Sequence, residues 1–156
     1  MPPTTPSQTV GPFYSIGLSR RPENELVPSG VRLHGRLLDG EGAGIDGMIE
    51  LWDARAGRWG RSGTDADGGF EFVVAKPEPF PGEAPRLDVY VFARGLLMHQ
   101  LTRVYFPDEA GANAADPVLS QLPADDRATL VAVPEDGALR FDIRMQGDRA
   151  TVFFAV

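Results

Sequence analysis

The sequence predicts an all-β fold, a sandwich of two antiparallel sheets with an extended N-terminal arm and a short loop helix. The 156 residues include 18 Gly and 14 Pro, so the segments between turns are short. Most of those segments alternate apolar and polar residues, which is the period of a half-buried strand. Hydrophobic residues make up 42% of the chain, enough to bury the core of about one domain.

The first predicted strand, residues 31–38, shows the alternation clearly. Val31, Leu33 and Leu37 fall on one face, and Arg32 and His34 fall on the other. Six further strands follow from the same pattern, and seven strands suit a sandwich. We expect them at residues 48–52, 69–75, 87–93, 101–106, 139–145 and 150–155.

Two segments do not follow the strand pattern. Residues 116–122 predict a short helix, because Asp116 can cap it and Pro117 suits its first turn. Residues 1–30 are rich in proline and have no sustained period, which predicts an extended arm. We therefore divide the chain into an arm, residues 1–30, and a sandwich core, residues 31–156.

Composition excludes several classes of function. The chain has no cysteine, which rules out disulfides, thiolate zinc sites and iron–sulfur clusters and is typical of a reducing compartment. A net charge of -7 disfavours nucleic acid as a partner. No segment approaches the roughly 20 apolar residues that cross a bilayer, so we expect a soluble, cytoplasmic protein without membrane contact.

Familiar motifs fail their context tests. The segment GAGIDG, residues 42–47, matches the spacing of a dinucleotide fingerprint, but the residues after it predict a strand rather than a helix. The segment DADGG, residues 65–69, lacks oxygen donors at the first and last positions of a calcium loop. His34 and His99 have no partners at metal-ligand spacing. Turns and surface histidines explain these features.

Six stretches resemble the intradiol ring-cleavage dioxygenases and occur in that family's order from residue 5 almost to the C-terminus. They are TPSQTVGPFYSIGL, GRLLDGEGAGIDGMIELWDA, TDADGGFEFVVAKPEPFP, VFARG, TRVYF and RFDIRMQGDRATVFF. Within the family the likeness is to the iron-free α chains, although the segment between Trp52 and Arg61 is shorter here than in typical α chains.

The resemblance implies αβ protomers in larger oligomers, with a ferric ion (Fe3+) held by two tyrosines and two histidines of the partner β subunit. The implied reaction cleaves protocatechuate (3,4-dihydroxybenzoate) with O2 to 3-carboxy-cis,cis-muconate. This chain is then expected to contain no catalytic residue and to be inactive alone.

Three residues stand where the resemblance implies that metal ligands lie in the iron-binding chain. Phe80 in KPEPFP replaces a tyrosine, and Arg86 and Asp88 replace two histidines. Phe80 has no donor atom and Arg86 is a permanent cation, so we expect a vestigial site that binds no metal. Arg86 and Asp88 either form an ion pair where the metal would sit or are two unrelated surface charges.

The resemblance also implies that this chain lines the mouth of its partner's site. Gly11, Pro12 and Phe13 match the arm positions that reach the partner, and Arg94 in VFARG matches an arginine that assists binding of the anionic substrate. The alternatives are that Phe13 merely anchors the arm on a surface and that Arg94 forms an ion pair between subunits or a hydrogen bond at the strand end.

Two other functions stay open from the sequence. A non-catalytic transthyretin-like sandwich module shares the GRLLD, IELWDA and TDADGGFEF patterns but needs neither the arm nor VFARG. A catalytic dioxygenase with an unfamiliar ligand set would retain ferric iron without a partner.

Overall fold

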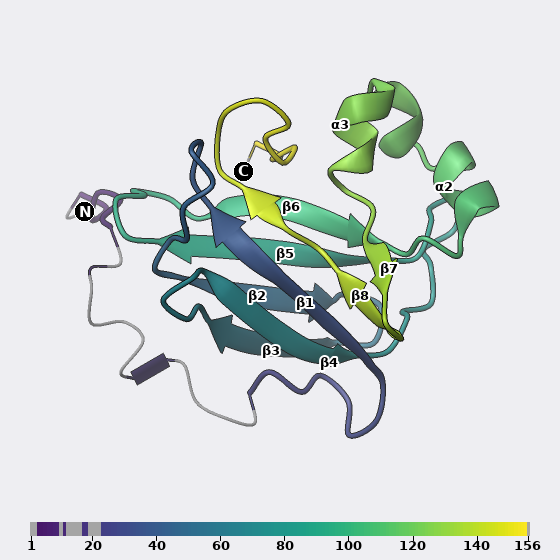
Figure 1. Cartoon of the computed structure of the whole chain (residues 1–156), viewed down its shortest axis with the longest axis horizontal. Coiled ribbons are helices and arrows are strands. Elements are labelled where there is room, and N and C mark those ends of the chain that lie inside the picture. The colour runs from purple at the N-terminus through teal and green to yellow at the C-terminus, as the bar shows by residue number, and fades with distance from the viewer. Residues whose placement is uncertain (1–2, 10, 12–16, 19–22, 156) are drawn as a thin grey trace.

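The computed structural model describes residues 3–9, 11, 17–18 and 23–155. Two sheets lie face to face, and short helices gather at one end of the sandwich (Figure 1). The first sheet contains β4 (Gly69–Val74), β1 (Val31–Leu38), β8 (Ala138–Arg140) and β7 (Val133–Glu135) in that order, and β9 (Ile143–Arg144) also pairs with β1. The second contains β3 (Arg58–Gly63), β2 (Gly47–Asp53), β5 (Arg86–Ala93) and β6 (Gln100–Tyr105).

The predicted two-sheet sandwich is confirmed, with one difference in pairing. Every pair in the second sheet is antiparallel. In the first sheet β1 pairs in parallel with both β8 and β9, so that sheet is mixed. The parallel pairs arise because β8 and β9 follow the helical region in the chain and run along β1 in the same direction.

The core lies between the sheets and is built by strict alternation. In β5, Leu87, Val89 and Val91 are fully buried, whereas Arg86, Asp88 and the other outward residues are half-buried. Burial of the inward residues supplies most of the driving force for the fold. A second cluster, Ala84, Tyr105, Leu119 and Leu130, joins the helical region to the end of the sandwich.

Three predicted elements need correction. The segment 139–145 forms two short strands, because Phe141 and Asp142 between them bond to β1 as a connection: Phe141 N donates to His34 O, and Asp142 accepts from Arg36 N. The segment 150–155 is not a strand and contributes one isolated bridge, from Phe154 to Leu101. The predicted helix at 116–122 is only a 3-10 turn, Leu119–Gln121, because Pro123 forces Leu122 before it into an extended conformation.

Some elements were missed by the sequence. They are the strands β3 and β7 and the helices α2 (Ala110–Ala115) and α3 (Ala124–Ala128). β3 reads RWGRSG and has almost no apolar residues, yet it pairs with β2 along its whole length, and Trp59 stacks on Trp52 with ring centroids 5.9 Å apart. The helices α2 and α3 have six and five residues, which is below the length at which periodicity is informative.

The end of the predicted arm packs on the sandwich. Glu25 bridges to Val73, Leu26 N donates to Val73 O over 2.9 Å, and Leu26 and Val27 are buried. The division of the chain at residue 30 stays a prediction, but this segment already contacts the core. None of the helices in the described part of the chain is long and apolar enough to cross a membrane.

Candidate functional site

The predicted site residues lie at opposite ends of one strand. Arg86 begins β5 and Arg94 follows its last residue. They are eight positions apart, a distance of roughly 26 Å at about 3.3 Å per residue. Figure 1 shows the β5–β6 loop, which carries Arg94, beside the N-terminal residues at the left, while the start of β5 lies at the end that faces the helices. The two groups are separate sites.

A charged cluster surrounds the start of β5. The Arg86 side chain is 10% exposed and donates to Asp88 Oδ1 over 2.5 Å and to Glu83 Oε2 over 2.9 Å. Its guanidinium also lies over the ring of Phe80, 5.8 Å from the centroid. Arg103 approaches Asp88 from β6, with Nε 3.4 Å from Oδ1. The expected pair of Arg86 and Asp88 is therefore present, and Asp88 is shared between two arginines.

This charged cluster does not fit a ferric ion. Phe80 offers no ligand atom, Arg86 places a permanent positive charge among the acidic groups, and Asp88 is already bonded to it. In the part of the chain that the structure describes, no three His, Cys, Asp or Glu residues are grouped so that they could hold a metal ion. Identification of the cluster as a former metal site stays a prediction.

Tyr105 and Asp116 extend the cluster into the interior. Burial raises the pKa of Tyr105 above its usual value, and the nearby Arg103 and Arg86 only partly offset this effect. The neutral phenol donates to Asp116 Oδ1 over 3.3 Å. Asp116 also accepts from the backbone N–H groups of Ala84 and Leu119. Tyr105 is thus held as a hydrogen-bond donor to a structural carboxylate.

Sequence reasoning missed Glu83, Arg103 and Tyr105 as members of this cluster. The pairing register of β5 and β6 places Arg103 opposite Asp88 and Tyr105 opposite Arg86. Both strands were predicted, and the short loop between them would have allowed this register to be estimated. No signal in the sequence indicated Glu83.

The other end of β5 carries an unpartnered arginine. Arg94 is exposed, and its side chain makes no hydrogen bond or ion pair with any other described residue. It lies in a tight turn, closed by Leu96 N donating to Ala93 O over 3.2 Å. Gly95 has φ +95°, a conformation that glycine adopts without strain. The guanidinium is therefore free to bind an anion.

The arm meets this turn directly. Gly95 N donates a hydrogen bond to Thr9 Oγ1 over 3.1 Å. Gly11, two residues further on, has φ +73°. The structure thus places the described arm residues beside the turn of Arg94, while the substrate-binding roles of Gly11 and Arg94 stay predictions. Pro12 and Phe13 lie outside the described residues, so their contribution to the site stays a prediction.

A cleft of 360 Å³ separates the arm from the β5–β6 loop. Ser7 and Gln8 line it from the arm, Phe92 and Ala93 from the end of β5, and Leu96–His99 from the loop. Leu97 and Met98 are 66% and 49% exposed. Exposed apolar side chains of this size next to an unpartnered arginine are typical of a surface that another protein covers.

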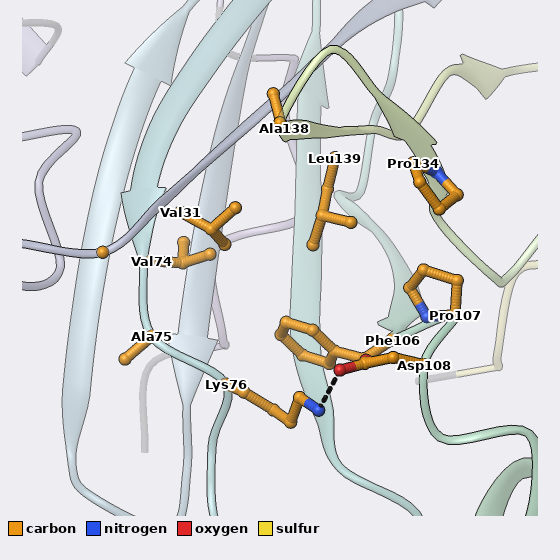
Figure 2. A pocket seen from close by; sticks show the side chains of 12 residues that line it. Val31, Val74, Ala75, Lys76, Phe106, Pro107, Asp108, Pro134, Ala138 and Leu139 are labelled. Atoms are coloured by element: carbon orange, nitrogen blue, oxygen red, sulfur yellow. Dashed lines mark hydrogen bonds and ion pairs between the residues drawn. The ribbon is translucent and has the colours of Figure 1, made fainter.

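A larger cavity of 540 Å³ lies at the opposite end of the sandwich. Figure 2 shows the side chains that line it. Its walls are mostly apolar and include Val31, Val74, Phe106 and Leu139. At its edge Lys76 Nζ bonds to Asp108 over 2.5 Å and to Glu109 over 2.7 Å, and these bonds raise the pKa of Lys76. Lys76, the cation among the described residues that line the cavity, is already paired, and none of the predicted site residues is among that lining.

Comparisons with known proteins give close relatives of this chain. No family model matches it. It is 40% identical to a protocatechuate 3,4-dioxygenase alpha chain from Burkholderia cepacia, with 97% of each chain covered. It is 34% identical to the alpha chain of the same name from Pseudomonas putida, with 97% of this chain and 96% of the relative covered. The alignments are longer than this chain, so both relatives carry segments that it lacks.

Solved structures share the fold at lower identity. The dioxygenase domain of a dioxygenase and carbohydrate-binding protein fusion from Streptomyces sp. SirexAA-E has a TM-score of 0.62 at 23% identity, over 92% of this chain and 98% of that one. Hydroxyquinol 1,2-dioxygenase from Pseudomonas putida DLL-E4 has a TM-score of 0.60 at 17% identity, over 90% of this chain and 65% of that one. These structures support the sandwich fold.

Proposed function

This chain belongs to the family of protocatechuate 3,4-dioxygenase alpha chains, and from that membership we propose that it is the iron-lacking α subunit of such an enzyme. The enzyme is an oxidoreductase that cleaves protocatechuate with O2 to give 3-carboxy-cis,cis-muconate. The proposal includes a β subunit that binds the ferric ion, assembly into higher αβ oligomers, and a cytoplasmic location.

The observation that carries this division of labour is the contrast between the two ends of β5. The end where a metal site is expected is filled by an arginine whose charge is already paired. The other end presents a free arginine next to an arm that bonds to the same turn. A chain of this kind is suited to complete a site on another subunit rather than to contain one.

In the proposed complex, each residue of this chain has a binding role. Arg94 binds the carboxylate of protocatechuate, because a guanidinium matches a carboxylate with two parallel hydrogen bonds. Gly11 allows the arm backbone to approach the substrate closely, and Pro12 stiffens the arm. Phe13 supplies an apolar wall for the aromatic ring.

Ferric iron in the partner subunit would take the two hydroxyl groups of the substrate and prepare the ring for O2. The residues of this chain then have to orient the ring, so that its hydroxyl groups face the metal, and to keep water away from the mouth of the site. Arg94 does the first by holding the carboxylate at the opposite side of the ring, and the arm does the second.

Oxygen uptake tests the proposal. This chain and a candidate β chain are purified separately and after co-expression, and each sample is mixed with protocatechuate. We expect consumption of one O2 per substrate only when both chains are present. Full activity of the β chain alone, or ring opening by this chain alone, would refute the assignment. A transthyretin-like binding module would leave the activity of the β chain unchanged.

A further inference from the structure

We propose that Thr9 is a positioning residue, a clasp that fixes the direction of Arg94 and the register of the arm through one hydrogen bond. The inference rests on the proposed function, because it concerns how Arg94 and the arm reach the substrate. It assigns to Thr9 an action through Arg94 and not a contact with the substrate.

The turn that carries Arg94 needs such a clasp. Ala93 O accepts from Leu96 N, which makes Arg94 and Gly95 the two central residues of a β-turn. Gly95 has positive φ, whereas the described non-glycine residues with positive φ are Asp136 and Arg149, so Arg94 does not share that conformation. This combination identifies a type II turn.

A type II turn leaves one peptide group free to reorient. Types I and II differ mainly in the orientation of the peptide that joins the two central residues, and glycine at the second position is compatible with both. Rotation of the Arg94–Gly95 peptide changes ψ of Arg94 and leaves its φ nearly unchanged. The Cα–Cβ bond stays in place, but the rotamers that the Arg94 side chain favours change with ψ. The turn's own hydrogen bond does not prevent this rotation, because it joins Ala93 and Leu96.

Thr9 supplies the missing restraint. The N–H of Gly95 belongs to the peptide that could rotate, and it donates to the Thr9 hydroxyl over 3.1 Å. The two residues are 86 positions apart in the sequence, so the bond is a tertiary contact. It holds the turn in its type II form and so restricts the rotamers open to Arg94.

The same bond sets the register of the arm. Ser7 and Gln8 line the same cleft as Phe92 and Leu96. The next residue, Thr9, bonds the arm to the β5–β6 loop. Gly11 follows two residues later, within about 7 Å of extended chain. A single hydroxyl therefore places both the arm residues and Arg94, which explains how two exposed segments can present one defined edge.

The test uses the co-expressed αβ complex and a set of variants in this chain. Thr9→Val keeps the shape and removes the acceptor, Thr9→Ser keeps the acceptor, and Thr5→Val is a matched control in the same exposed arm. For protocatechuate we expect Thr9→Val to raise KM about fivefold with little change in kcat, the factor that corresponds to one neutral hydrogen bond. Thr9→Ser should restore the KM of the unmodified complex.

Two further readouts separate positioning from a general loss of structure. Hydrogen exchange of the Gly95 amide in the complex should accelerate about fivefold in Thr9→Val and not in Thr5→Val. In the double variant Thr9→Val/Arg94→Ala, KM should exceed that of Arg94→Ala by clearly less than fivefold, because part of the effect of Thr9 passes through Arg94. For catechol, which has no carboxylate, Thr9→Val should raise KM by a smaller factor than for protocatechuate.

Each contrary result has a definite meaning. Unchanged exchange at Gly95, a Thr9→Ser variant as impaired as Thr9→Val, or fully multiplicative effects in the double variant would overturn the clasp. A strong effect of Arg94→Ala with a silent Thr9→Val would overturn the clasp alone and leave the proposed function standing. If Arg94→Ala itself is silent, the proposed role of Arg94 fails and the positioning role of Thr9 fails with it.

Discussion

Replacement of Arg94 by alanine gives the sharpest expectation about substrate binding. Arg94 is exposed and makes no bond to another described residue, so its removal should change the free energy of unfolding of this chain by less than about 0.5 kcal/mol. In the complex, the lost contact with the substrate carboxylate is a hydrogen bond to a charged group, worth about 1.5–3 kcal/mol. We therefore expect kcat/KM for protocatechuate to fall roughly 10- to 150-fold.

The assay compares protocatechuate with catechol, which carries the same two hydroxyl groups but no carboxylate. Arg94→Ala should leave kcat/KM for catechol close to that of the unmodified complex, so that most of the preference for the acid disappears. Arg94→Lys should fall between the two, because it keeps the charge and loses the planar pair of donors. Arg32→Ala is a matched control. Arg32 is an exposed arginine on the sheet that does not contain β5, where it pairs with Glu71 of the neighbouring strand.

The reasoning is refuted if both substrates lose activity by the same factor. That result would mean that Arg94 holds the two subunits together, which is the alternative role that the sequence left open. Sedimentation of the variant complex distinguishes the two roles directly, since a substrate contact leaves assembly intact.

Other expectations concern the buried and charged groups near the start of β5. Asp116 is 1% exposed and accepts from two buried backbone N–H groups, so Asp116→Ala should cost about 3 kcal/mol or more in urea unfolding, and a loss below about 1 kcal/mol would contradict this account. Because burial raises the pKa of Tyr105, the stability that its neutral phenol contributes is present below about pH 10 and is lost as pH rises through the raised pKa. The loss in free energy of unfolding caused by Tyr105→Phe should therefore shrink as pH rises past about 10. A loss that stays constant with pH would contradict this expectation. Arg86→Met leaves Glu83 without its guanidinium partner and should lower the free energy of unfolding by about 1–3 kcal/mol, whereas an unchanged Tm would show that the network is not stabilising.

The strands that were predictable are those buried on one face. In β5 the alternation of Leu87, Val89 and Val91 with polar residues gave the strand and its two faces correctly, because burial itself imposes the period of two. β3 was not predicted, because a strand at the edge of a sheet buries few side chains and so shows no clear alternation. Its Trp59 packs against Trp52 on the outer face of the sheet. The segment 150–155 is apolar for a different reason: Val152 and Phe154 pack against the cluster around Tyr105 without joining a strand.

The site was predictable only in part. The contact between Arg86 and Asp88 could be expected from two residues on one face of a strand, but the contributions of Glu83 and Arg103 depend on a loop and on cross-strand register. The bond from Thr9 to Gly95 joins residues 86 positions apart, and nothing local in either segment indicates it. Long-range contacts of loops escape pattern reasoning because no periodicity accompanies them.

The iron content of the purified αβ complex tests the central claim most directly. This chain is held to contribute no metal ligand, since an arginine occupies the place where the resemblance puts ligands. We expect one ferric ion for each αβ pair and none in this chain when it is purified alone and incubated with ferric iron. Two ions for each pair, or iron retained by this chain without its partner, would contradict the account.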